Sequence, residues 1–219
     1  MEGKVPTRKT ESFHLATLLG IGSNKIYNLI PITVIAAVLI FLTKEILDLY
    51  KKSKEKKRKI AAMKLLLVEE IELNHWVWKS MNSFISDLND HIDDIDSLVI
   101  EVTETKSGME SITGTYLNGD MFGQDFPKVR FSRYHQLAID LAIADEKFYE
   151  KVKNCYEAVS ALNHLRDGVY TYFDADSIEY AFREGYISYA NDHLSEIQMK
   201  MNELYMYCTG NRLEKFRLR

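Results

Sequence analysis

The stretch IYNLIPITVIAAVLIFLT, residues Ile26–Thr43, has 18 residues and no charge, and the basic stretch KKSKEKKRK follows at Lys51–Lys59. An uncharged apolar run of this length is typical of a membrane-spanning helix. A cleaved signal peptide would have a shorter apolar region ending in small residues, whereas this one ends in Ile40, Phe41 and Leu42. The run therefore predicts a single transmembrane helix over residues 26–43.

The distribution of positive charge around this segment predicts its orientation. Residues 44–59 contain eight Lys and Arg residues, whereas residues 1–25 contain four. Because positive residues stay on the cytoplasmic side, we expect residues 1–25 to lie outside the membrane or in its interface. The chain beyond Thr43 is then cytoplasmic. The basic collar, residues 44–59, is expected to contact anionic lipid headgroups rather than nucleic acid.

Residues 60–96 have the periodicity of one long helix. Apolar or neutral residues recur there at steps of three or four, which is the spacing of one helix face. Asn74 interrupts this apolar face. Such a residue either fixes the register between packed helices or forms hydrogen bonds within its own domain. Together with Trp76 and Trp78, Asn74 is a candidate contact between copies of the chain in a homo-oligomer.

The next part of the chain predicts an insertion followed by more helices. Residues 97–130 contain a β-like run and the two-residue turn Asn118-Gly119, so a loop or small hairpin is expected there. Apolar periodicity then returns. Three further helices are expected over about residues 132–144, 145–169 and 176–207.

These elements predict an all-α fold class: a transmembrane helix that continues into a long helix, and a cytosolic helical bundle with one insertion. The two cysteines, Cys155 and Cys208, lie at apolar helical positions and are expected to be reduced thiols. The predicted segments are an N-terminal segment (1–25), the transmembrane helix (26–43), the collar (44–59), the bundle (60–208, insertion 97–130) and a basic C-terminal tail (209–219).

The segment FPKVRFSRYH, residues 126–135, carries the most informative chemistry. Arg130 and His135 are separated by four residues at the expected junction of a loop and a helix. Arginine can hold a phosphate and stabilise its developing charge, and histidine can transfer protons at a ribose hydroxyl. Alternatively, Arg130 pairs with an acidic neighbour and His135 packs in the first turn. Common catalytic motifs are missing from the sequence, and no metal or cofactor is expected.

The Arg130–His135 spacing is similar to that of HEPN domains, small helical bundles in which an Arg-x4–6-His motif lies at such a junction and two protomers meet. With the apolar segment, the collar and the long helix, the chain resembles the small membrane-anchored HEPN-like accessory proteins of type VI-B CRISPR loci. The family usually has a polar residue after the arginine, and here it is Phe131. The resemblance therefore implies a structural or RNA-contacting pair more than a strongly catalytic one.

The resemblance also implies a function in antiviral defence. In that family the accessory protein strengthens an RNA-guided CRISPR RNase, its expected partner, and subunits assemble around a pore that depolarises the membrane, which the resemblance implies to be the bacterial inner membrane. One helix cannot enclose a conduit, so a pore requires a homo-oligomer. Its candidate residues in the membrane are Asn28, Pro31, Thr33 and Thr43. Two alternatives remain open: a membrane-tethered, metal-independent HEPN ribonuclease, and a single-pass scaffold that binds a partner protein.

Overall fold

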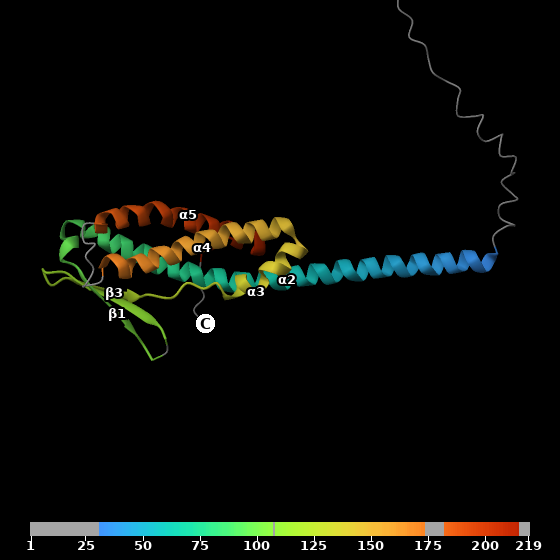
Figure 1. The fold of residues 1–219 in the computed structure, drawn as a ribbon, viewed down its shortest axis with the longest axis horizontal. Coiled ribbons are helices and arrows are strands. Elements are labelled where there is room, and N and C mark those ends of the chain that lie inside the picture. Colours follow the sequence, from blue (N-terminus) through green and yellow to red (C-terminus); the bar gives the residue numbers. More distant parts are fainter. Residues whose placement is uncertain (1–30, 107, 174–181, 215–219) are drawn as a thin grey trace, which may run out of the picture. The chain divides into compact units, whose positions relative to one another are not determined.

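Helices make up most of this protein, as the sequence predicts. The computed structural model describes residues 31–106, 108–173 and 182–214 (Figure 1). The all-α prediction is wrong in one respect, because a small antiparallel sheet is also present. The elements in chain order are α2 (Ile32–Asp90), the 3₁₀ helix η1 (Ile92–Ser97), β1 (Val99–Glu104), β2 (Glu110–Thr115), β3 (Met121–Asp125), α3 (Ser132–Ala144), α4 (Glu146–Phe173) and α5 (Arg183–Thr209).

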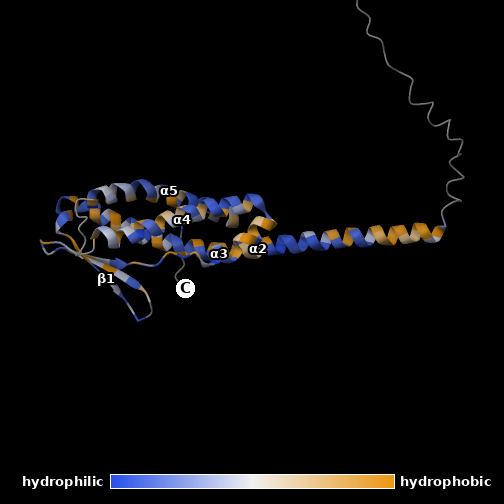
Figure 2. Cartoon of the chain, viewed as in Figure 1, coloured by the Kyte–Doolittle hydropathy of each residue, from blue (hydrophilic) through white to orange (hydrophobic). Residues whose placement is uncertain are grey.

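The chain divides into two compact units, residues 1–55 and 56–219. In the first unit the predicted N-terminal segment, residues 1–25, lies outside the described residues. The described part is the beginning of α2, whose side chains are exposed and largely apolar as far as Leu42 (Figure 2). The second unit contains the rest of α2 and every later element, and the core and the candidate site lie there.

Within the described residues, no helix combines the length and the apolar character that crossing a membrane requires. The predicted segment 26–43 is only partly described, since residues 26–30, with Asn28 among them, lie outside the described ranges. The described part of this uncharged run therefore extends only from Pro31 to Thr43, because the next residue is the charged Lys44. The described part of the chain therefore does not by itself supply the transmembrane helix that the sequence predicts.

The second unit has one hydrophobic core, to which α2, α4 and α5 contribute most of the side chains. The periodic face predicted for the long helix is the face that α2 buries, from Met63 to Leu88. This prediction is confirmed. The helix ends at Asp90 rather than near Asp96, because the chain tightens into η1 through bonds such as that from the Asp94 N–H to the His91 carbonyl.

The three strands form an antiparallel sheet in the order β1-β2-β3, inside the predicted insertion. The predicted turn at Asn118-Gly119 lies between β2 and β3, and Gly119 has the positive φ of 91° that favours glycine. The sheet packs on α2 through the rings of Phe84 and Phe122, whose centroids are 5.8 Å apart. After β3 the chain returns to the helices at the buried Phe126, which leads directly into the Arg130–His135 segment.

Candidate functional site

The two motif residues lie at the beginning of α3. Arg130 is in the extended segment before this helix and His135 is in its first turn, and both side chains are exposed. The Phe131 ring stacks on the His135 imidazole, with 6.0 Å between centroids and 19° between planes. The residue that departs from the family pattern is therefore a packing partner of the histidine.

Glu70 of α2 holds the first turn of α3 in place. Its carboxylate accepts hydrogen bonds from the Ser132 hydroxyl (2.9 Å) and from the backbone N–H groups of Arg133 (2.8 Å) and Tyr134 (3.2 Å). The Tyr156 hydroxyl donates a fourth, at 2.6 Å. Glu70 is only 2% exposed. The N-cap residue of α3 is Phe131, whose side chain has no oxygen that could accept from the free N–H groups of the first turn. The Glu70 carboxylate accepts from these groups instead, and its negative charge lies near the positive end of the helix dipole.

Asn74, one turn further along α2, fixes the backbone of Arg130. The Asn74 side-chain amide donates to the Arg130 carbonyl, and the Arg130 N–H donates to the Asn74 amide oxygen, both at 2.8 Å. Asn74 is fully buried. The prediction that it contacts another copy of the chain is wrong, because its amide is paired within its own domain. The arginine backbone is therefore fixed while its side chain remains in solvent.

The two tryptophans predicted as oligomer contacts have different environments. The Trp78 indole donates its Nε1–H to the Leu194 carbonyl at 2.7 Å and packs against the core, so this residue joins α2 to α5. That position argues against its predicted contact with another copy. Trp76 is half-buried and lines a surface pocket that also contains Arg130.

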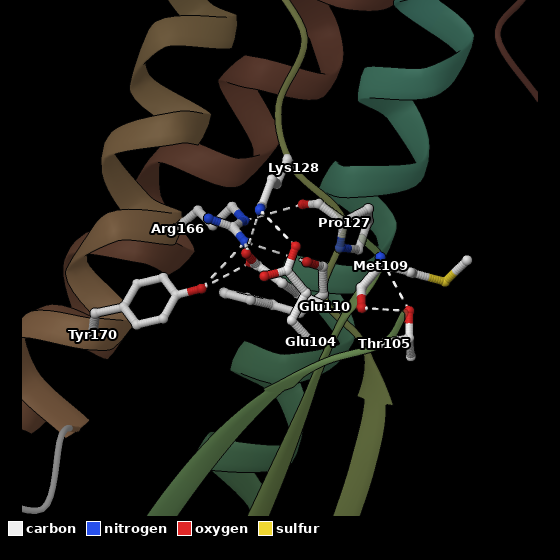
Figure 3. A network of polar contacts seen from close by, with 9 residues as sticks. Glu104, Thr105, Met109, Glu110, Pro127, Lys128, Arg166 and Tyr170 are labelled. Carbon is white, nitrogen blue, oxygen red and sulfur yellow. Dashed lines mark hydrogen bonds and ion pairs between the residues drawn. The ribbon is translucent and has the colours of Figure 1, made fainter. Parts of the chain in front are cut away.

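A second polar network fixes the chain just before Arg130 (Figure 3). Arg166 of α4 is only 6% exposed and donates to the Pro127 carbonyl at 3.0 Å from Nε. Its guanidinium also pairs with the carboxylate of Glu110, at the beginning of β2. Lys128 forms an ion pair with the other oxygen of Glu110 at 2.7 Å, and the Tyr170 hydroxyl donates to Glu110 at 2.9 Å. The network therefore joins the sheet, α4 and the segment leading to the motif.

The electrostatics of Glu110 depend on these partners. Burial by itself would raise the pKa of the Glu110 carboxyl, but hydrogen bonds from Lys128 and Tyr170 and the charge of Arg166 outweigh it and hold the pKa below its ordinary value. Glu110 is therefore ionised at neutral pH, where it neutralises the buried Arg166.

The chemistry available at this surface is that of exposed cations beside an imidazole. Arg130, Lys128 and the half-buried Arg133 supply positive charge, and His135 supplies a proton donor or acceptor. Across the described ranges, no three His, Cys, Asp or Glu side chains are placed to hold a metal ion. Such a combination of groups suits contacts to phosphate oxygens.

No protein-family model, no curated protein and no solved structure matches this chain. Its function is therefore inferred from the residues of the site and from the resemblance carried by Arg130 and His135.

Proposed function

We propose that this chain is a membrane-anchored, HEPN-like domain that binds RNA through Arg130 and His135. The observation that carries the proposal is that the backbone of this segment is fixed by buried residues while its two motif side chains are exposed. Glu70 and Asn74, both buried in α2, fix its backbone through hydrogen bonds, while the two motif side chains remain exposed. A backbone fixed in this way holds its charged side chains ready for a ligand and reduces the entropy lost on binding.

A second copy of the chain would complete the site. On α3, Ile139 and Ile143 follow His135 at intervals of four residues and are 77% and 80% exposed. Residues at this spacing share one helix face, so the face that carries His135 continues as an apolar stripe. Covering this stripe with its counterpart from a second copy would remove two isoleucines from water and bring two motifs together, as the HEPN resemblance implies.

Replacing Arg130 with alanine is expected to weaken binding of a short single-stranded RNA about 10-fold at moderate salt. Removing one cation that pairs with a phosphate should also reduce the slope of log affinity against log salt by about 0.7. Fluorescence anisotropy of labelled RNA with the purified 219-residue chain measures both quantities. Lys147→Ala removes an exposed cation from the first turn of α4 and is the matched control, which should leave the affinity and the slope unchanged.

Equal losses in R130A and K147A would contradict the assignment of the site, and no RNA binding by the unmodified chain would contradict the proposal itself.

Ile139→Asp tests whether the site needs two copies of the chain. The apparent mass of the purified protein in solution and its affinity for RNA should fall together in this variant. Shortened RNA products that appear with the unmodified chain but not with His135→Ala would assign the ribonuclease alternative instead.

The beginning of α2 favours a second candidate function, the oligomeric pore implied by the resemblance. Its large apolar side chains from Ile32 to Leu42 are exposed, and exposed apolar surface of this extent requires lipid or other copies to cover it. Pro31, Thr33 and Thr43 are the candidate pore residues within the described part. The Thr43 hydroxyl donates to the Leu39 carbonyl at 2.7 Å, which lowers the cost of placing it in an apolar environment.

If the pore proposal is correct, the purified chain in a planar bilayer should give discrete conductance steps, and Thr33→Val should change their size. A chain in which Val38 is replaced by Asp, at the middle of the apolar segment, should insert poorly and give no steps. Steps of the same size and frequency from V38D would contradict the pore. An RNA-guided CRISPR RNase remains the proposed partner, and its addition with RNA would test whether conductance depends on it.

A further inference from the structure

A surface pocket of about 390 Å³ lies between α4 and α5, and no residue of the segment 126–135 lines it. The two helices lie side by side (Figure 1), and the Tyr186 hydroxyl of α5 donates to the Leu165 carbonyl of α4 at 2.6 Å. The volume is within the range of small-molecule sites. The pocket is therefore a second candidate site, separate from the surface that carries Arg130 and His135.

Two glycines line the pocket, one on each helix, and their surroundings differ. A Cβ at the buried Gly168 of α4 would lie 2.6 Å from the Tyr186 ring, so this glycine lets the ring pack against the helix. A Cβ at Gly185 of α5 would have no heavy atom of the described residues within 4 Å, and the φ of Gly185 is not positive. Neither packing nor backbone conformation therefore requires glycine at 185, although glycine weakens a helix relative to alanine. Its effect is to keep the pocket free of a side chain.

The wall of the pocket on α5 is largely aromatic. Phe182 is 61% exposed and Tyr189 is 42% exposed, and both line the pocket with the buried Tyr186. The Tyr189 ring also contacts the His193 ring, with 4.3 Å between centroids. A ligand needs only apolar contact with these side chains and no free ring face, because the burial of apolar surface is favourable without a set direction. The pocket therefore favours a ligand with an apolar body.

The polar part of the wall comes from α4 and carries negative charge. Among the described residues that line the pocket, Asp167 is the carboxylate and none is a lysine or arginine. Asp167 accepts a hydrogen bond from the Asn163 side chain at 2.9 Å, and within the described ranges no cation forms an ion pair with it. His164 also lines the pocket and can donate or accept a hydrogen bond. Glu184, in the first turn of α5, offsets the positive end of that helix. The charges therefore favour a cationic ligand over an anionic one.

We propose that this pocket binds a small organic cation. Its ammonium group pairs with the Asp167 carboxylate, and its apolar body occupies the open space beside Gly185. No residue of the Arg130–His135 segment takes part, so the site is independent of RNA binding. A bound cation joins α4 to α5 and should raise the melting temperature of the chain, because it binds the folded state.

Three probes of similar size test the preference for a cation: phenethylamine, the neutral phenethyl alcohol and the anionic phenylpropionate, each with a fluorine in the para position. Fluorine NMR of the probes with the purified 219-residue chain measures their affinities. The amine should bind about 3- to 10-fold more tightly than the alcohol, as one charged contact at an exposed carboxylate would give. The propionate should bind most weakly. Asp167→Asn should abolish the preference for the amine, whereas Glu150→Gln, the matched control at an exposed carboxylate elsewhere on α4, should keep it.

Gly185→Leu tests the pocket itself, because the leucine side chain would occupy the open space. All three probes should lose binding, while the melting temperature should stay the same or rise, since leucine favours a helix more than glycine does. Any probe that partitions into detergent does so with both chains, so the difference between them measures the pocket. If G185L melts at a lower temperature, D167N, which adds no volume, decides the test.

Amine binding that is unchanged in G185L, or no binding of any probe to the unmodified chain, would overturn the pocket. Equal affinities for the three probes, or a preference for the amine that persists in D167N, would overturn the cation as its ligand.

Discussion

Glu70→Ala should lower the free energy of unfolding by about 3–5 kcal/mol, because it leaves four hydrogen-bond donors without their acceptor in a largely buried site. Two of these donors are backbone N–H groups at the first turn of α3. Urea unfolding followed by tryptophan fluorescence measures the loss. Faster hydrogen exchange at the Arg133 and Tyr134 amides would locate it.

Two further variants sharpen this prediction. Glu70→Gln keeps the size of the side chain but replaces one acceptor oxygen with a donor that faces other donors, so we expect a smaller but clear loss. Glu72→Gln, on the same helix, is the matched control, since Glu72 is half-buried and accepts a hydrogen bond from Tyr205 at 3.1 Å. It should cost about 1 kcal/mol or less. Equal losses for E70A and E72Q would contradict the capping role of Glu70.

Arg166→Met should be destabilising by about 3–5 kcal/mol, as expected when one member of a buried ion pair is removed. The substitution removes the buried cation that pairs with the half-buried Glu110 carboxylate, which keeps only the exposed Lys128 as a cationic partner, and it removes a donor from the Pro127 carbonyl. Lys153→Met is the matched control on the same helix. Lys153 pairs with Glu157 in solvent, and loss of that pair should cost about 0.5 kcal/mol or less.

The pH dependence of the R166M effect follows from the lowered pKa of Glu110. A carboxyl whose folded-state pKa is depressed contributes stability above its unfolded-state pKa, and this contribution disappears as the pH falls through the folded-state value. The difference in stability between the unmodified chain and R166M should therefore shrink below about pH 4. A difference that stays constant from neutral to acidic pH would contradict the charge-pairing role of Arg166.

The long helix could be predicted well because its information is local. From Met63 to Leu88 the spacing of apolar residues alone identifies the buried face. Asn74 was recognisable as an exception within that face, but its partner was not, since the Arg130 backbone lies 56 residues away in the sequence. The sequence does not point directly to Glu70 as the residue that caps α3. Its position one turn before Asn74, on the same side of the helix, is the signal that could have identified it as a second buried polar residue.

The sheet and the buried Arg166, which joins it to α4 through Glu110, were harder to predict for a related reason. The β-like run near Val99 and the turn at Asn118-Gly119 were visible, but strand β3 contains Gly123 and little apolar alternation. Its existence depends on pairing with β2, which is not a local property. Arg166 lies four residues after Leu162 and three before Val169, so the periodicity of α4 places it on the buried face. Its partner at the Pro127 carbonyl is 39 residues away in the sequence, and no local pattern identifies it.

The strand order β1-β2-β3 has a consequence for solubility when many copies are crowded together. A three-stranded sheet has two open edges, and an open edge can pair with that of another chain and start aggregation. Here β1 carries the exposed carboxylates Glu101 and Glu104, and β3 ends in the exposed Asp125. Two such edges repel each other. Crowded copies are therefore expected to keep their sheet edges apart and to resist joining into larger, irreversible assemblies.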